Sequence, residues 1–178
     1  IDNLLESVAI EVNEDRLEYA RHDVRQIIDE ALTLVRPILR QKHQTTAIEL
    51  DQAPETVEVD AKRILQVLVN LLSNASKYSP EGSSITLTVD AVAHNLRIVL
   101  ADQGPGLGDE DGAMIFERYY RAPSLSAGQA GMGLGLWVVR SIVERHGGWV
   151  EAQSRPEGGS VFRVFVPCQR RNHENPGG

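Results

Sequence analysis

Hydrophobic residues between positions 61 and 77 recur at spacings of three and four, which predicts a helix with one apolar face. The apolar stripe consists of Ile64, Val67, Leu68, Leu71, Leu72 and Ala75. A second stripe carries Asn70 and Asn74, one helical turn apart. Asn is unfavourable inside a helix because its side chain competes for backbone hydrogen bonds. The pair therefore indicates that these two side chains serve something outside the helix.

The same periodicity predicts two more helices, over residues 24–42 and 134–146, and Asp23 and Asp60 are suited to cap the first two helices. Alternating patterns predict strands at 17–23, 46–51, 84–92, 96–101, 149–153 and 161–166, the last four forming two hairpins. Residues 52–59, with Pro54, are interpreted as a connection. The sum predicts an α+β fold, a two-layer sandwich in which three helices cover one face of a mixed, mostly antiparallel sheet of five or six strands.

Both ends of the chain differ from this central part. Residues 1–14 place apolar side chains on one helical face, but so short a helix is marginal without a partner. Two interpretations stay open: a helix docked on its own domain, or the end of a longer helical hairpin. Residues 168–178 are polar and are expected to fray. The expected organisation is therefore an N-terminal piece at 1–16, a domain at 17–167 and a tail at 168–178.

Composition narrows the class of protein. The 178 residues are 42% hydrophobic and 24% charged, which are globular values. A formal charge of −7 argues against a surface for nucleic acid. The single cysteine, Cys168, excludes an internal disulfide, and no apolar run is long enough to predict a membrane span.

Glycine is concentrated in one region. Eight of the 15 glycines lie between Gly104 and Gly135, a segment with little periodicity that is interrupted by the island 114–121. Long glycine-rich segments in compact domains are often functional lids. The second glycine cluster runs into a predicted helix, where unpaired backbone N–H groups bind phosphate well. Neither cluster fits the common P-loop or Rossmann fingerprints, so a purely structural loop is the alternative.

Taken in order, these segments resemble the catalytic ATP-binding domain of sensor histidine kinases, members of the Bergerat-fold ATP-binding superfamily. NLLSNASKYS resembles the N box, DQGPGLG the first glycine box, IFERYYR the F box and GMGLGL the second glycine box. The resemblance covers residues 17–167 and implies a long glycine-rich ATP lid. It also implies that residues 1–16 are the end of a dimerisation and phosphoacceptor hairpin.

The resemblance implies ATP and Mg²⁺ as cofactors and assigns roles to individual residues. Asn74 would ligate the Mg²⁺ that bridges the phosphates, which agrees with the preference of this ion for oxygen ligands. Asn70 would stand where the ATPase relatives carry a glutamate base. Lys77 and Tyr78 would contact phosphate or ribose, and Asp102 would accept a hydrogen bond from the amine of adenine.

Further positions follow from the other boxes. Arg121 is a candidate for contact with the γ-phosphate, and Ser160 would support Asp102 or a bound water. The two glycine boxes are expected to surround the nucleotide through Gly104, Gly106, Leu107, Gly131, Gly133, Leu134, Gly135 and Leu136. Simpler interpretations exist for two of these residues: Lys77 as a solvated cation at a helix end, and Asp102 as a turn former before glycine.

The function implied is that of a protein histidine kinase fragment, which donates the γ-phosphoryl group of Mg-ATP to a histidine on a separate hairpin. None of the five histidines has a phosphoacceptor context. The expected partners are that hairpin and the receiver domain of a response regulator. The expected location is cytoplasmic, with no membrane contact in this segment and a homodimeric parent for which a membrane anchor stays open. The alternatives are an ATP-hydrolysing switch and a non-catalytic nucleotide-binding module. Asn70 argues against the switch because no obvious base remains to activate water.

Overall fold

The computed structural model describes residues 16–107, 112–118 and 134–169. The predicted N-terminal helix, the polar tail and most of the expected lid lie outside these ranges. The helices are α2 (Val24–Gln41), α3 (Ala61–Tyr78), α4 (Gly135–Arg145) and the short 3₁₀ turn η1 (Met114–Phe116). The strands are β1 (Ala20–Asp23), β2 (Thr45–Glu49), β3 (Thr56–Val59), β4 (Ser84–Val92), β5 (Asn95–Ala101), β6 (Trp149–Ser154) and β7 (Ser160–Pro167).

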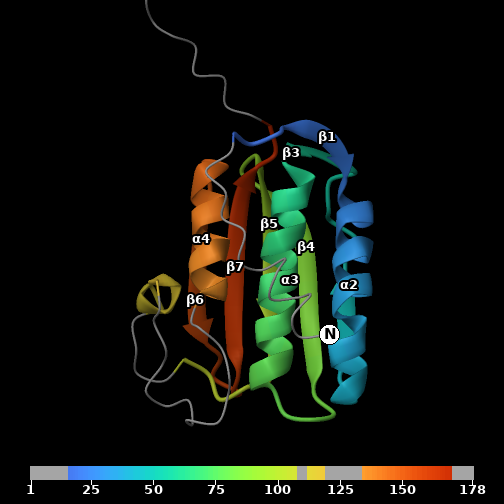
Figure 1. Cartoon of the computed structure of the whole chain (residues 1–178), viewed down its shortest axis with the longest axis vertical. Helices are drawn as coiled ribbons and strands as arrows, with labels where there is room; N and C mark the ends of the chain where they lie inside the picture. Colours follow the sequence, from blue (N-terminus) through green and yellow to red (C-terminus); the bar gives the residue numbers. More distant parts are fainter. Residues whose placement is uncertain (1–15, 108–111, 119–133, 170–178) are drawn as a thin grey trace, which may run out of the picture.

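Five strands form one mixed sheet in the order β2-β4-β5-β7-β6. β2 and β4 are parallel, and the other neighbours are antiparallel. The parallel pair requires a crossover, and that crossover contains β3 and α3. In Figure 1, α2, α3 and α4 stand side by side on one face of this sheet. The predicted α+β fold with two layers is confirmed.

The helices begin where the sequence predicts. The Asp23 carboxylate accepts a hydrogen bond from Gln26 N at 3.1 Å, and the Asp60 carboxylate accepts one from Arg63 N at 3.1 Å, so each caps its helix. The apolar stripe of α3 is fully buried between the other helices and the sheet. Burial of such a stripe, rather than intrinsic propensity, holds α3 in place.

Two details of the prediction are wrong. Residues 52–59 are not a plain connection, because they contain β3. The predicted strand 17–23 begins only at Ala20, and it pairs with β3 in a separate two-stranded sheet instead of joining the main sheet. Val57 and Val59 point inward from β3 and are buried. Among the described residues, no helix is long and apolar enough to cross a membrane.

Candidate nucleotide-binding site

Asp102 lies directly after β5 and is 3% exposed. Its Oδ1 accepts hydrogen bonds from Gly104 N at 2.8 Å and Ser160 N at 3.1 Å, and its own N–H donates to Ser160 O at 2.9 Å. Within the described ranges, Oδ2 accepts no hydrogen bond. A buried carboxylate oxygen without a partner is costly, so this atom is suited to accept a bond from a ligand.

The electrostatic state of Asp102 follows from its surroundings. Burial raises the pKa of this carboxyl above its usual value, because the charged form loses hydration. The backbone N–H groups of Gly104 and Ser160 and the positive charge of Arg155 counteract this rise. The backbone dipoles and this one cation therefore limit the rise in the pKa of Asp102 but do not outweigh the effect of burial.

The first glycine box lies against the end of α3. A Cβ added at Gly104 would lie 3.0 Å from Asp102 Oδ1 and 3.1 Å from Tyr78 O, so a larger residue would crowd both. Gly106 has a φ of +82°, and a Cβ there would lie 3.2 Å from Ser154 Oγ. The chain approaches this closely only because both positions are glycine.

Serine side chains hold the first glycine box on both sides. The N–H of Leu107 donates to Ser154 Oγ at 2.9 Å. Gln103 N donates to Ser79 Oγ at 3.3 Å, and Gln103 Oε1 accepts from Ser84 N at 3.0 Å. Neither Ser79 nor Ser154 was predicted as a site residue. Serines close to glycine clusters are too common to be singled out without knowledge of the tertiary contacts.

The C-terminal end of α3 is held by the segment that joins α2 to β2. The Lys42 ammonium donates to the carbonyl oxygens of Ser76 at 2.5 Å and Ser79 at 2.7 Å. Gln44 is 7% exposed, and its Nε2 donates to Ser76 O, Ser79 O and Pro80 O at 3.0–3.2 Å. These donors satisfy carbonyls that a helix end leaves unpaired. They thereby fix the helix end that carries Lys77 and Tyr78.

The two predicted asparagines meet the start of α4. A Cβ added at Gly135 would lie 3.2 Å from Asn70 Oδ1 and 3.6 Å from Asn74 Nδ2. Asn70 is buried, and its Nδ2 donates to Gln66 O at 3.0 Å. Asn74 is half-buried and makes no side-chain hydrogen bond to any described residue. The N box and the end of the second glycine box, distant in sequence, are thus brought together.

The remaining predicted residues fall into two groups. Lys77 is half-buried, and its ammonium lies 5.2 Å from the centre of the Tyr78 ring. Leu134 and Leu136 are half-buried at the N-terminal end of α4, and Leu134 provides no side-chain cap. Arg121, Gly131 and Gly133 lie outside the described residues.

The F-box segment is anchored by aromatic and apolar contacts. Ile115 and Phe116 are buried in η1, and Phe116 packs edge to face on Phe162 of β7 with ring centres 6.5 Å apart. The guanidinium of Arg118 lies 5.0 Å from the centre of the Trp137 ring. These contacts anchor the described part of the F-box segment to β7 and to α4.

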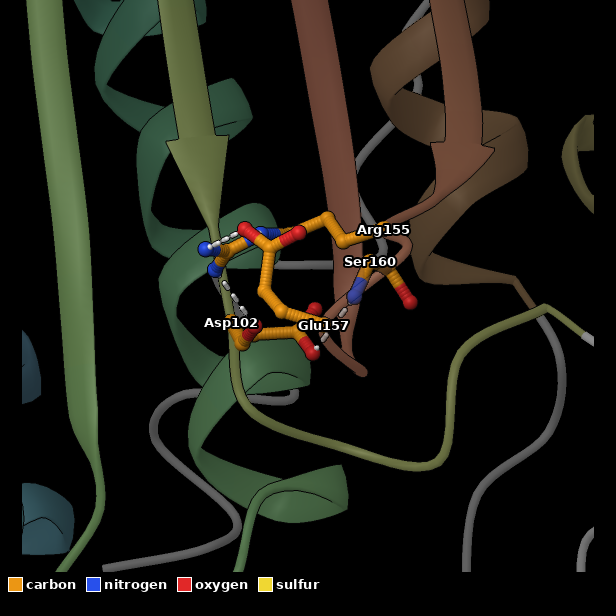
Figure 2. Close-up of polar contacts among 4 residues, drawn as sticks. All are labelled: Asp102, Arg155, Glu157 and Ser160. Atoms are coloured by element: carbon orange, nitrogen blue, oxygen red, sulfur yellow. Dashed lines mark hydrogen bonds and ion pairs between the residues drawn. The ribbon is translucent and has the colours of Figure 1, made fainter.

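The turn between β6 and β7 completes the surroundings of Asp102 (Figure 2). Gly159 has a φ of +89°, and a Cβ there would lie only 2.0 Å from Asp102 O. Arg155 Nη1 donates to Asp102 O at 3.2 Å, and Arg155 Nε donates to Glu157 at 3.0 Å. The predicted support from Ser160 comes through its backbone N–H. Arg155 was not predicted, because an Arg before Pro-Glu-Gly looks like an ordinary solvated turn residue.

The asparagine face fits a magnesium ion that is held mainly by phosphate oxygens and water. Among the described residues, no group of three or more His, Cys, Asp or Glu is placed to hold a metal. Asn74 offers a carboxamide oxygen, and Mg²⁺ accepts few protein ligands because it keeps several waters. Asn74 would hold the ion, which would neutralise phosphate charge.

Comparison with known proteins agrees with this arrangement. Residues 59–170 match the family of histidine kinase-, DNA gyrase B-, and HSP90-like ATPases. The chain is 36% identical over 169 residues to the adaptive-response sensory kinase SasA of Synechococcus sp. (strain CC9311), covering 92% of this chain and 44% of that protein. It thus spans less than half the length of this relative.

Two solved structures share the fold over nearly the whole chain. Full-length ShkA in complex with AMPPNP superimposes with a TM-score of 0.77 at 27% identity, over 93% of this chain and 36% of that chain. Histidine kinase ThkA in complex with response regulator protein TrrA gives 0.75 at 25% identity, over 96% and 49%. The chain therefore belongs to the histidine kinase-, DNA gyrase B-, and HSP90-like ATPase family, and its resemblance to the catalytic domain of sensor histidine kinases is confirmed.

Proposed function

We propose that this chain binds Mg-ATP and donates its γ-phosphoryl group to a histidine on a separate dimerisation hairpin of a two-component sensor kinase. The observation that carries the proposal is Asp102, a buried carboxylate whose Oδ1 is fixed by two backbone N–H groups. Its Oδ2, which has no partner among the described residues, matches the exocyclic amine of adenine. The ShkA neighbour, a complex with AMPPNP, supports an adenine nucleotide as the ligand.

The phosphate end of the proposed site is the junction of α3 and α4. The N-terminus of α4 carries no side-chain cap, so its N–H groups and helix dipole favour a phosphate. Asn74 faces this junction from α3 and would hold Mg²⁺, while Asn70 occupies the place of a base without being basic. Positioning and charge neutralisation are the main requirements of phosphoryl transfer. This arrangement favours transfer of the phosphoryl group to the hairpin over hydrolysis of ATP by water.

The partners are proposed from the relatives. The ThkA neighbour is a complex with a response regulator, and we extend this class of partner to the parent of the present chain. Residues 1–16, of which only Arg16 lies within the described ranges, would be the end of the phosphoacceptor hairpin. Arg121 would contact the γ-phosphate from the segment 119–133, which the structure does not describe.

Titration calorimetry with ADP and ATP, with and without Mg²⁺, tests the proposal. We expect dissociation constants in the micromolar range for the Mg-nucleotide and no stable label on the chain after incubation with γ-labelled ATP. A supplied hairpin domain carrying its histidine should become labelled. Absence of nucleotide binding would refute the proposal, and rapid hydrolysis of ATP by the chain alone would favour the ATPase switch instead.

A further inference from the structure

Asp102 is approached from both sides of the sheet. Ile98 and Leu100 of β5 point into the core under the helices, and Asp102 continues this alternation. A Cβ at Gly104 would contact both Asp102 Oδ1 and Tyr78 O, which places the carboxylate on the side of α3. No helix of the described ranges lies on the opposite side of the sheet (Figure 1). The carboxylate and the backbone carbonyl of Asp102 therefore face different surroundings.

Arg155 reaches Asp102 from that open side. Trp149, Glu151 and Gln153 of β6 are exposed, whereas Val150 and Ala152 between them pack on the core. Arg155 continues the exposed series, and Figure 2 shows its side chain in front of the end of β5 with α3 behind. Its Nη1 donates to Asp102 O at 3.2 Å. The guanidinium thus holds the backbone of Asp102, not its carboxylate.

Glu157 fixes the other edge of the same guanidinium. Its Oε1 accepts from Arg155 Nε at 3.0 Å and also from Nη2. The Arg155 side chain is 27% exposed and that of Glu157 is 61% exposed. Two backbone bonds close the turn, from Arg155 N to Gly159 O at 2.9 Å and from Gly158 N to Arg155 O at 3.1 Å. The Arg155 guanidinium therefore donates hydrogen bonds along two of its edges, and these bonds fix its orientation. The side chain of a surface arginine is rarely held in this way.

The charged groups around Asp102 are few. The turn between β6 and β7 contributes Arg155, which bonds the Asp102 carbonyl, and Glu157, which pairs with Arg155. The neighbouring end of α3 carries Lys77, whose ammonium lies over the Tyr78 ring. Arg155 is the side chain whose charge acts directly on the Asp102 carboxyl and lowers its pKa against the effect of burial. Glu157 is ion-paired with Arg155 and carries the opposite charge. We therefore expect Glu157 to weaken the effect of Arg155 on Asp102.

We propose that Arg155 and Glu157 form a positioning pair for Asp102: Arg155 fixes the backbone of this residue and favours its ionised carboxylate, and Glu157 orients Arg155 and moderates its charge. The inference rests on the proposed nucleotide-binding function and concerns how the base is selected. An ionised carboxylate accepts a hydrogen bond from the amine of adenine. It repels the carbonyl oxygen that hypoxanthine presents at the same place, to which a protonated carboxyl would instead donate. The pair would thus set the preference for adenine.

The experiment first measures the pKa of the Asp102 carboxyl and then the binding of nucleotides. The pH titration of its side-chain carbon is recorded by NMR without nucleotide in the wild type, Arg155→Met and Glu157→Gln, with Asp102→Asn to assign the signal. We expect the pKa of Asp102 to rise in Arg155→Met and to fall in Glu157→Gln. The matched control is Arg163→Met, which removes a cation of β7 that has no contact with Asp102 and should leave the titration unchanged.

Calorimetry with ADP and IDP then tests the consequence for the base. Arg155→Met should weaken ADP binding roughly three- to tenfold and reduce the preference for ADP over IDP, most strongly at mildly acidic pH. Glu157→Gln should retain the preference for ADP over IDP to a lower pH than the wild type does. If Arg155→Met fails to fold, the milder Glu157→Gln still tests the proposal, because the pKa of Asp102 is expected to fall in that variant.

The outcomes separate the two proposals. Equal shifts in Arg155→Met and Arg163→Met, or no shift in either turn variant, would overturn the positioning pair. If the shifts occur but the wild type binds neither ADP nor ATP, the proposed function fails while control of Asp102 by the pair stands. If ADP binds and the preference for ADP over IDP is the same in the wild type and in both turn variants, the pair has no role in selecting the base.

Discussion

Asp102 and Asn74, the residues proposed to contact the base and the metal, are held in opposite ways. Asp102 is enclosed by backbone groups: two N–H groups bind its Oδ1, Ser160 O accepts its N–H, and Gly159 lies against its carbonyl. The Asn74 carboxamide makes no hydrogen bond to a described residue, although it stands in the middle of a well-packed helix. The base end is organised by the protein itself. The proposed metal end offers a side chain that has no hydrogen-bond partner among the described residues.

This difference assigns different consequences to substitutions. A group that the fold holds through many contacts contributes to folding and to binding, so changing it affects both. A group without internal partners contributes to binding alone. Changes at the base end should therefore lower the free energy of unfolding, and changes at the metal end should not. The predictions below run from the largest expected loss of stability to the smallest.

Gly159→Ala should have the largest effect. The new Cβ would lie 2.0 Å from Asp102 O, and the φ of +89° is unfavourable for any residue with a side chain. We expect a loss of about 4 kcal/mol in the free energy of unfolding, measured by urea denaturation. The matched control is Gly158→Ala in the same turn, where φ is +96° but no atom lies within 4 Å of the added Cβ. It should cost only about 1 to 2 kcal/mol, and equal losses would contradict the role of close packing.

Gln44→Leu should come next. Gln44 is buried, and the change removes the Nε2 donor to the carbonyls at the end of α3 and the acceptor of the Ser76 hydroxyl. Buried polar groups left without partners cost about 2 kcal/mol in unfolding free energy. Gln41→Leu, at an exposed position at the end of α2, is the control and should change stability by less than about 0.5 kcal/mol. A harmless Gln44→Leu would show that Lys42 alone holds the helix end.

The sequence predicts the elements of the base end well but not its contacts. The helix predicted at 61–77, the two hairpins and the place of Asp102 after a strand follow from periodicity and turn residues, because local interactions determine them. Lys42 and Gln44 could not be recognised, since their value lies in reaching carbonyls more than 30 positions away in the chain. β3 was missed for a related reason. Four residues after Pro54 carry too little pattern to reveal a strand whose partner is β1.

The asparagine pair of α3 was easier to single out from the sequence, and its role at a metal stays a prediction. Asn70 and Asn74 stood out because carboxamides are unusual at adjacent turns of a helix interior, and their contact with Gly135 agrees with the order of the boxes. The same reasoning cannot say which asparagine is bonded within the fold. Asn70 Nδ2 donates to Gln66 O, whereas Asn74 makes no such bond to a described residue, and residue spacing does not determine side-chain conformation.

His146 gives a pH-dependent comparison at the other end of α3. Its Nε2 accepts from Asp60 N at 3.2 Å, and burial lowers its pKa below the usual 6.5. Below pH 6.5 the unfolded chain therefore binds a proton at His146 that the folded chain does not bind. The contribution of the neutral, buried His146 to the free energy of unfolding is complete above pH 6.5 and is lost as the pH falls below it. We expect a loss of up to about 1.4 kcal/mol per pH unit in urea denaturation. His146→Gln should remove that slope, whereas His43→Gln, at an exposed position, should preserve it.

Asn74→Ala should have the smallest effect on stability and the clearest effect on binding. The side chain has no described partner and Ala favours helix, so the free energy of unfolding should stay within about 0.5 kcal/mol of the wild type. Calorimetry should show that Mg²⁺ no longer strengthens ADP binding. Asn70→Ala is the matched change one turn earlier, and it should destabilise by about 1 kcal/mol because Asn70 is buried and bonded to Gln66 O. If Asn74→Ala unfolds the protein as readily as Gln44→Leu, the metal end is organised by the fold as firmly as the base end, and the contrast between them disappears.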